Sequence, residues 1–187
     1  AQADRVLIVD CDVHQGDGTA SLTAGRDDIV TLSIHAEKNF PVRKARSSLD
    51  IGLPDGTGDD DYLAVLDAHL PRLLDDFAPD IVLYQAGVDP HANDKLGRLA
   101  LSDSGLERRE RYVVDAVRSR RVPLASALGG GYGEDQREVA GRHARSMIAM
   151  ASENARYAAP ASNRYPRSPS DSRTTRTRAA GSSAGSA

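Results

Sequence analysis

The stretch Val6-Leu-Ile-Val-Asp-Cys-Asp-Val-His-Gln-Gly-Asp-Gly18 decides the fold, because a short apolar run leads directly into a polar cluster. The β-branched apolar residues at its start are typical of a buried parallel strand. Three carboxylates and one imidazole follow the run: Asp10, Asp12, His14 and Asp17. We therefore expect a rigid strand that carries polar chemistry at its carboxyl end.

The spacing of Asp12 and His14 suits a metal ion. A carboxylate oxygen and an imidazole nitrogen two residues apart form a donor pair for a divalent first-row metal. The same residue types are also common in strand-to-helix loops, where Asp17 could turn the chain or cap the next helix. An EF-hand is excluded, because Ser21 stands where the calcium-binding glutamate would be. A metal site here requires a further acidic ligand downstream.

Length and composition predict one globular domain. A sequence of 187 residues with 40% hydrophobic content can bury a sizeable core. It has no run long enough to span a membrane and no signal pattern, so we expect no membrane partner and a cytoplasmic protein. The single cysteine, Cys11, excludes a disulfide framework and a cysteine-rich zinc site. Its aspartate neighbours should raise the pKa of the thiol, so we expect a buried, unreactive residue.

The last thirty residues differ from the rest. Residues 158–187 are rich in Ser, Pro, Arg, Ala and Gly and have no periodic apolar face, so we expect disorder there and a folded domain over residues 1–157. Five arginines and one aspartate give this segment a charge of +4, which leaves −7 for the domain. An acidic domain and dispersed arginines argue against specific nucleic-acid binding.

Apolar runs alternate with helical patterns along the domain. We expect strands at residues 6–9, 29–34, 81–85 and 122–128, helical segments at 19–24, 59–77, 102–120 and 135–157, and a long loop at 36–58. This alternation predicts parallel strands joined by right-handed helical crossovers, an α/β fold. Ligands of such sheets bind outside the carboxyl ends of the strands.

The residues best suited to chemistry all follow a predicted strand: Asp10 to Asp17, His35, Asp89, and Gly129 to Tyr132. Asp89 is the candidate for the missing acidic ligand, and Pro90 holds its backbone extended. The alternative for Asp89 alone is a helix cap or a turn residue. Two aspartates and one histidine leave a coordination position open, which is the pattern of a catalytic zinc site.

Tyr132 follows three glycines. Glycines let the backbone approach a ligand closely, so this loop can bring a phenol beside the metal, where it can donate a hydrogen bond to an oxyanion. A phosphate-binding loop is disfavoured, because no lysine followed by serine or threonine stands after the glycines as in a P-loop.

Five motifs in this order resemble the zinc-dependent histone deacetylase and acetylpolyamine amidohydrolase family: Asp10-x-Asp12-x-His14-x-Gly-Asp17-Gly, Ser33-Ile-His35, Phe40-Pro41, Gly87-x-Asp89 and Gly129-Gly-Gly-Tyr132. The resemblance covers roughly residues 4–150. Segments 12–16 and 95–102 are similar to a class IV-like bacterial branch. The resemblance implies a three-layer α/β/α fold of the arginase–deacetylase type, with a parallel sheet.

The resemblance also implies roles for individual residues. Asp12, His14 and Asp89 would hold zinc or iron(II), and Tyr132 would polarise the acyl carbonyl. A monovalent cation, K⁺ in particular, would lie among Asp10, Asp12, His14, Ser33 and Ile34. The substrate, an acetylated lysine or polyamine, would contact Phe40, Gly130 and Gly131.

Asp10 and Asp17 would orient a pair of catalytic histidines, and this is where the sequence departs from the family. The sequence contains no two adjacent histidines, which lie upstream in the family together with the first part of the sheet. We therefore expect the C-terminal portion of a deacetylase domain, truncated at its N-terminal side. The histidines outside the cluster have simpler roles: we expect His35 to be structural, His69 to lie on a helix surface and His143 on an outer helix. His91 is near Asp89 in the sequence and could approach the site, but a solvated loop position is the favoured interpretation.

Three functions remain open. The first is a metal-dependent amidohydrolase that removes acetyl groups from lysine or polyamine amines, impaired by the loss of its proton-transfer residues. The second is a non-catalytic remnant that at most binds metal. The third is a ureohydrolase-like enzyme with two manganese ions, disfavoured because Gly16 stands where a further carboxylate is needed.

Overall fold

The computed structural model describes residues 3–158. The disorder that we predicted for the last thirty residues therefore lies almost wholly outside the described residues. Within them strands and helices alternate as the sequence pattern indicated, except that the strands Ile29–Ala36 and Leu49–Leu53 follow each other without a helix between them.

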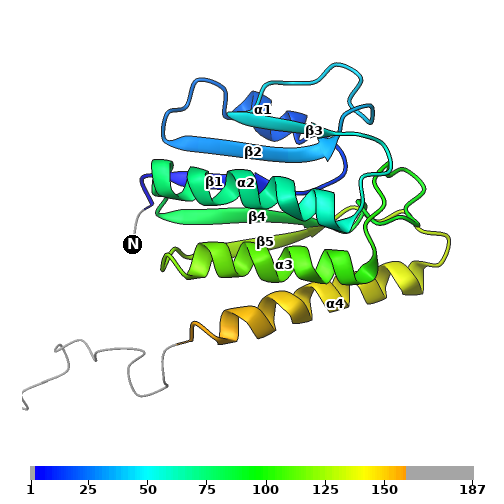
Figure 1. Ribbon diagram of the computed structural model, residues 1–187. Helices are drawn as coiled ribbons and strands as arrows, with labels where there is room; N and C mark the ends of the chain where they lie inside the picture. Colours follow the sequence, from blue (N-terminus) through cyan, green and yellow to red (C-terminus); the bar gives the residue numbers. More distant parts are fainter. Residues whose placement is uncertain (1–2, 159–187) are drawn as a thin grey trace, which may run out of the picture.

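Five parallel strands form one sheet in the order β3-β2-β1-β4-β5 (Figure 1). Their bounds are β1 Val6–Asp10, β2 Ile29–Ala36, β3 Leu49–Leu53, β4 Ile81–Gly87 and β5 Leu124–Gly129. The central strand β1 places Asp10 opposite Ser33 of β2 and Gln85 of β4. The predicted parallel α/β sheet is confirmed, and its carboxyl ends lie on one side of the molecule.

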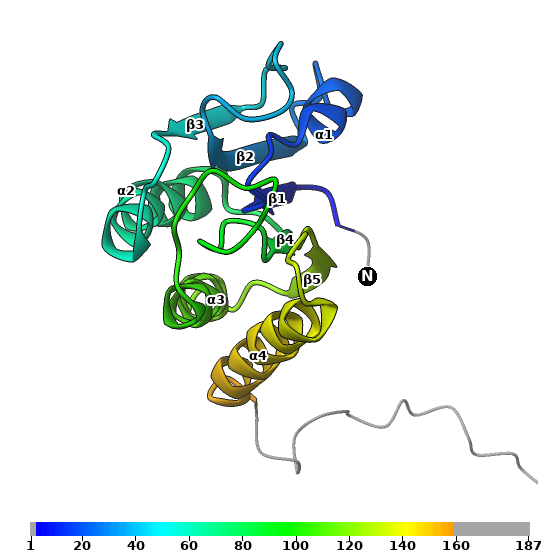
Figure 2. The ribbon, with the colours of Figure 1, turned by 90° about the vertical axis from the view of Figure 1, so that its right-hand side faces the viewer.

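Helices lie on both faces of this sheet, but they cover one face only in part, so that Leu83 of β4 and Leu128 of β5 are exposed (Figure 2). The bounds of the helices are α1 Asp17–Leu22, α2 Asp59–Phe77, α3 Asp103–Arg118 and α4 Gln136–Ala155. Helices α2 and α3 lie on one face and the short α1 on the other, while α4 packs beside α3 (Figure 2). Among the helices of residues 3–158, none is long and apolar enough to cross a membrane.

The core lies between the sheet and helices α2 and α3. Strand residues Leu7 and Val9 are fully buried there, because β1 has neighbours on both sides and helices above it. Helix α2 buries Tyr62, Leu66, Leu70 and Leu74, which recur at the three- and four-residue spacing of one helix face. The sequence pattern placed every helix and four of the strands to within two residues of their observed ends.

The predicted loop at residues 36–58 is wrong in part, because Leu49–Leu53 forms the edge strand β3. Leu49, Ile51 and Leu53 alternate with Asp50 and Gly52, which is the period-two pattern of a half-buried strand, but the prolines and glycines around this short segment led us to expect a loop. The Asp50 carboxylate accepts hydrogen bonds from the Ser47 N–H and the Gln15 side chain. A Cβ atom at position 52 would lie 3.1 Å from the Cβ of Glu37, which leaves little room for a side chain there.

Candidate metal centre

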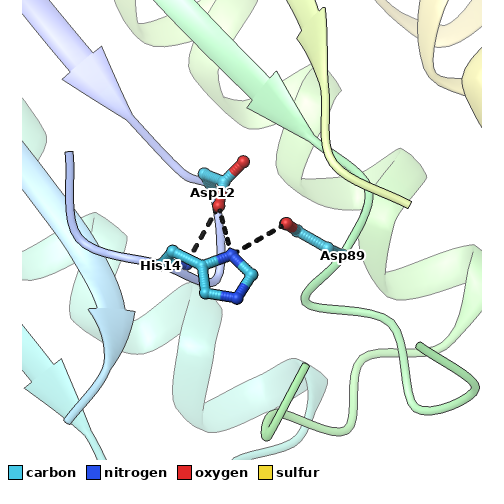
Figure 3. Close-up of side chains that lie close together, drawn as sticks. All are labelled: Asp12, His14 and Asp89. Atoms are coloured by element: carbon cyan, nitrogen blue, oxygen red, sulfur yellow. Dashed lines mark hydrogen bonds and ion pairs between the residues drawn. The ribbon is translucent and has the colours of Figure 1, made fainter. Parts of the chain in front are cut away.

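The ends of β1 and β4 place the predicted ligands together. The Cys11 N–H donates to the Gln85 carbonyl at 3.1 Å, so the backbone directly after β1 still pairs with β4 immediately before Asp12. Asp12 and His14 follow β1, and Asp89 follows β4. Figure 3 shows their side chains pointing toward one another. One ligand atom from each lies within 4.8 Å of the others.

The distances suit a single small cation. His14 Nδ1 lies 3.0 Å from Asp12 Oδ1 and 3.3 Å from Asp89 Oδ2. A tetrahedral zinc ion holds its ligands about 2.0–2.2 Å away, which separates them from one another by about 3.3–3.6 Å. The three donors therefore need only small side-chain movements to share one ion.

Asp89 supplies a second argument for a cation. Its side chain is 1% exposed. One carboxylate oxygen, Oδ1, accepts a hydrogen bond from the Val13 N–H at 2.9 Å. The other oxygen, Oδ2, is buried and lies 3.3 Å from His14 Nδ1, which also faces Asp12 Oδ1. Once the imidazole gives up the proton on that nitrogen, the buried oxygen has no hydrogen-bond donor among residues 3–158, and coordination of a metal ion would satisfy it.

The pKa values of the neighbouring residues His14 and Asp12 are also consistent with a cation in the cluster. Hydrogen bonding to Asp89, together with Asp12, raises the pKa of His14 to about 9. Burial, reinforced by the charge of Asp89, raises the pKa of Asp12 to about 6. Carboxylates that face one another away from water repel, and a divalent cation between them would remove that repulsion.

Asp10 lies behind the cluster as a support. Its Oδ1 accepts a hydrogen bond from the Asp12 N–H at 3.0 Å, which fixes the backbone of that residue. Burial raises the pKa of Asp10 to about 7. Gly16 leaves the space that this carboxylate occupies, since a Cβ there would lie 2.3 Å from Asp10 Oδ2. Asp17, the other carboxylate that was expected to orient catalytic histidines, is the first residue of α1 and is half-buried.

A cavity of about 430 Å³ opens above the cluster. It is lined by Asp12, His14, Asn39, Phe40, Asp89, Leu96, Gly130 and Tyr132. Phe40 and Tyr132 are exposed aromatic walls. The backbone of Tyr132 is anchored on the loop after β4, because its N–H donates to Asp94 Oδ2 at 2.6 Å.

Two residues that line this cavity, Asn39 and Leu96, were not among the predicted site residues. The Asn39 side chain donates to the Leu96 carbonyl at 2.7 Å and so ties together two loops that follow different strands. The adjacency of Asn39 to the Phe40-Pro41 motif was the available signal.

Three other predicted residues do not line the cavity. Ser33 and Ile34 are buried in β2, where the Ser33 hydroxyl lies 3.0 Å from His35 Nδ1. Gly131 lies against α4, since a Cβ there would be 2.6 Å from a Val139 methyl group. A monovalent cation at β2 and a substrate contact by Gly131 stay predictions.

The interpretation of His91 as a solvated loop residue is wrong. His91 is 7% exposed, and its Nε2 lies 3.4 Å from Asp103. The segment after it folds back, so that His91 pairs with Leu101 in an isolated bridge. This pairing joins residues ten apart and leaves no periodic signal in the sequence. Cys11 is fully buried as expected, although burial contributes more than its aspartate neighbours to raising its pKa to about 11.

These features define a parallel α/β protein with a carboxylate–histidine cluster, a candidate cation site, at the carboxyl edge of its sheet. Residues 1–149 match the histone deacetylase domain. The chain therefore belongs to the histone deacetylase family, which its five motifs resembled.

Proteins of other organisms are similar in sequence to this chain. The chain is 49% identical over 141 residues to an uncharacterized protein of Picosynechococcus sp., which covers 75% of this chain and 47% of that protein. It is 31% identical over 140 residues to a probable deacetylase of Archaeoglobus fulgidus, a match that covers 69% of this chain and 39% of that protein. The chain thus spans less than half the length of these relatives.

The fold is also found in a solved structure. An acetylpolyamine aminohydrolase from Burkholderia pseudomallei superposes with a TM-score of 0.67 at 21% identity, over 81% of this chain and 46% of that chain. The three-layer fold that the motifs predicted is thereby confirmed.

Gly130 allows a first test of the site. It has a φ of +65°, and a Cβ there would lie 2.3 Å from the Asp89 carboxylate. Gly130→Ala should displace Asp89 and weaken Zn²⁺ binding by about tenfold or more. The matched control is Gly25→Ala, which has a φ of +76° but nothing within 4 Å of its Cβ. That variant should lose only about 1 kcal/mol of stability to backbone strain.

Both variants are compared by thermal unfolding and by Zn²⁺ titration against a chromophoric chelator. Equal Zn²⁺ affinity of the two variants would contradict the role given to the space beside Asp89.

The raised pKa of His14 predicts how metal binding depends on pH. Its imidazole is protonated at neutral pH, and a metal ligand must lose that proton. The apparent Zn²⁺ affinity should therefore rise by up to about tenfold per pH unit between pH 7 and pH 9 and level off above. Titration calorimetry in buffers of different ionisation enthalpy should detect about one proton released per ion at pH 7.5. A flat affinity without proton release would contradict this.

Proposed function

We propose that this chain forms the metal-binding part of an amidohydrolase that removes acetyl groups from acetylated lysine or polyamine amines. The observation that carries the proposal is the convergence of Asp12, His14 and Asp89 beneath a cavity walled by Tyr132. Zinc is the proposed ion, with iron(II) as the second choice, because two carboxylates and an imidazole leave one position open. Family membership supports the reaction class.

Each residue has a proposed task. Zinc bound to Asp12, His14 and Asp89 would supply Lewis-acid polarisation of an amide carbonyl and a water of lowered pKa. The hydroxyl of Tyr132 would donate a hydrogen bond to the carbonyl oxygen as negative charge develops on it. Asp10 holds the backbone N–H of Asp12 and so keeps that ligand in place.

The walls of the cavity suit a slender, partly apolar substrate. Phe40, Tyr132 and Leu96 present apolar surface to an opening of about 430 Å³. A lysine or polyamine chain is a row of methylene groups that would pack between such side chains, with its acetyl group directed at Asp12 and His14. The named relatives include a probable deacetylase and an acetylpolyamine aminohydrolase.

Proton transfer is the step that these residues serve least well. The sequence has no adjacent histidine pair to act as general base and general acid. We propose that the 187-residue chain by itself turns over slowly, by several orders of magnitude, and that Asp10 and Asp17 serve histidines that this sequence does not contain. A chain that binds zinc without turnover is the second candidate, favoured by the same absence.

A ureohydrolase-like site with two manganese ions finds less support. In the part of the chain that the structure describes, the one ligand cluster has three members. Two bridged ions need more carboxylates at this spacing, and a glycine occupies position 16.

Removal of a ligand tests the metal site. Asp12→Asn and Asp89→Asn should each abolish stoichiometric Zn²⁺ binding, because either change leaves two protein ligands and one uncharged amide. The control is Asp75→Asn, since Asp75 is an exposed aspartate near the C-terminal end of α2 that pairs with Arg120 and is not one of the three cluster residues. Elemental analysis after dialysis gives the zinc content. A full equivalent of zinc in either ligand variant would refute the assignment.

Substitution of Tyr132 tests the proposed role of its hydroxyl in the reaction. With an acetyl-lysine peptide as substrate, Tyr132→Phe should lower kcat by about 10²–10³-fold and change KM little, since the phenol acts on the developing oxyanion. Tyr112→Phe is the control, because the Tyr112 hydroxyl on α3 donates a hydrogen bond to Asp67 on α2 and Tyr112 does not line the cavity.

The assay compares this chain with a longer protein that includes the upstream genomic sequence. Acetate release should be much faster from the longer protein. Equal and robust turnover by both would contradict the importance given to the missing histidines. Turnover by neither, with zinc bound, would favour the non-catalytic candidate.

A further inference from the structure

Arg109 is the largest fully buried side chain of the described residues, and it lies directly behind the candidate metal centre. It is on α3, on the helix side that faces the sheet, whereas its neighbours Arg108 and Arg111 are exposed and pair with surface carboxylates. A guanidinium in the core needs a specific reason, because removing its charge from water is costly.

The guanidinium of Arg109 bridges the two strands that carry the ligands. Nη1 donates to the Cys11 carbonyl at 3.2 Å, and Nη2 donates to the Gly87 carbonyl at 2.7 Å. Cys11 directly precedes Asp12, and Gly87 is the last residue of β4, two positions before Asp89. One side chain thus contacts the backbone just before both carboxylate ligands.

These two carbonyls belong to peptide groups that are held from both sides. The peptide between Cys11 and Asp12 donates its N–H to Asp10 Oδ1 at 3.0 Å while its carbonyl accepts from Arg109. The peptide between Gly87 and Val88 donates its N–H to the Gly129 carbonyl at 3.0 Å while its carbonyl accepts from Arg109. Since a peptide group is planar, bonds on both edges fix its orientation, and with it the direction of the next side chains.

The guanidinium is itself held in place. Glu110 is also fully buried, and its Oε1 accepts from Arg109 Nη2 at 2.6 Å. The second oxygen of Glu110 accepts from the Tyr84 hydroxyl, so β4 and α3 together orient the carboxylate. The planar fork of arginine suits this arrangement, because it can donate to two carbonyls and a carboxylate at once.

We propose that Arg109 is a positioning residue that sets the spacing of Asp12 and Asp89 by joining the ends of β1 and β4. The inference rests on the proposed metal-binding function. It predicts that loss of this bridge weakens metal binding even where the fold survives, as is typical of groups that orient metal ligands from behind.

The test must separate positioning from stability. Arg109→Met alone would leave Glu110 buried and unpaired, which by itself can unfold the chain. The decisive variant is therefore Arg109→Met combined with Glu110→Gln, which removes both charges and keeps an acceptor for the Tyr84 hydroxyl. Replacing a buried ion pair by neutral groups is often neutral for stability. Arg111→Met, an exposed position on the same helix, is the matched control.

The full chain is purified without metal, and two quantities are measured for each variant. Circular dichroism at 222 nm gives the melting temperature, and competition with a chromophoric chelator gives the Zn²⁺ affinity. We expect the double variant to melt within a few degrees of the wild type and to bind Zn²⁺ about 10–100-fold more weakly. Arg111→Met should match the wild type in both.

A folded double variant whose Zn²⁺ affinity lies within twofold of the wild type would overturn the proposal. If the double variant does not fold, Arg109→Lys decides: lysine keeps the positive charge beside Glu110 but lacks the planar fork whose two nitrogens each reach one carbonyl, so wild-type affinity of the lysine variant would equally overturn the proposal. A wild-type chain that binds no Zn²⁺ is a different outcome, since it overturns the proposed function on which this inference rests.

Discussion

The side-by-side ending of β1 and β4 is the constraint on which the rest of the molecule depends. Each strand buries alternate apolar residues, Leu7 and Val9 in β1 and Val82 and Tyr84 in β4, and is followed by an aspartate at the same edge of the sheet. Because the strands are parallel neighbours, Asp12 and Asp89 emerge close together although 77 residues separate them along the chain. The helices, the glycine loop and the cavity are all arranged around this pair.

Bringing these carboxylates together has an electrostatic cost that the surrounding groups partly offset. His14 lies between them with a raised pKa, and Val13 and Asp12 donate backbone N–H groups to the Asp89 and Asp10 carboxylates. On the helix side, Arg109 holds the carbonyls just before the ligands, and Glu110 balances its charge. The geometry of the cluster therefore depends on the surrounding backbone groups as much as on the three side chains themselves.

Close packing also decides which positions hold glycine. Gly16, Gly87 and Gly130 each border a carboxylate so closely that a Cβ would overlap it or its backbone. The glycines after β5 were expected to let the loop approach a ligand. In the structure Gly130 makes room for Asp89, while Gly131 packs against α4. The motif is thus explained by the volume of protein groups as well as by substrate access.

Local sequence patterns determined the parallel α/β fold, the helix positions and the candidate ligands. Apolar periodicity reports burial of neighbouring residues, and a polar residue directly after a buried strand lies at a predictable edge. Tertiary structure alone decided the rest. The edge position of β3, the burial of His91 and the bridge made by Arg109 each depend on pairing with another segment of the chain. A polar residue placed by such a partner looks, in the sequence, like any residue exposed to water, because its hydrogen bonds come from another part of the fold.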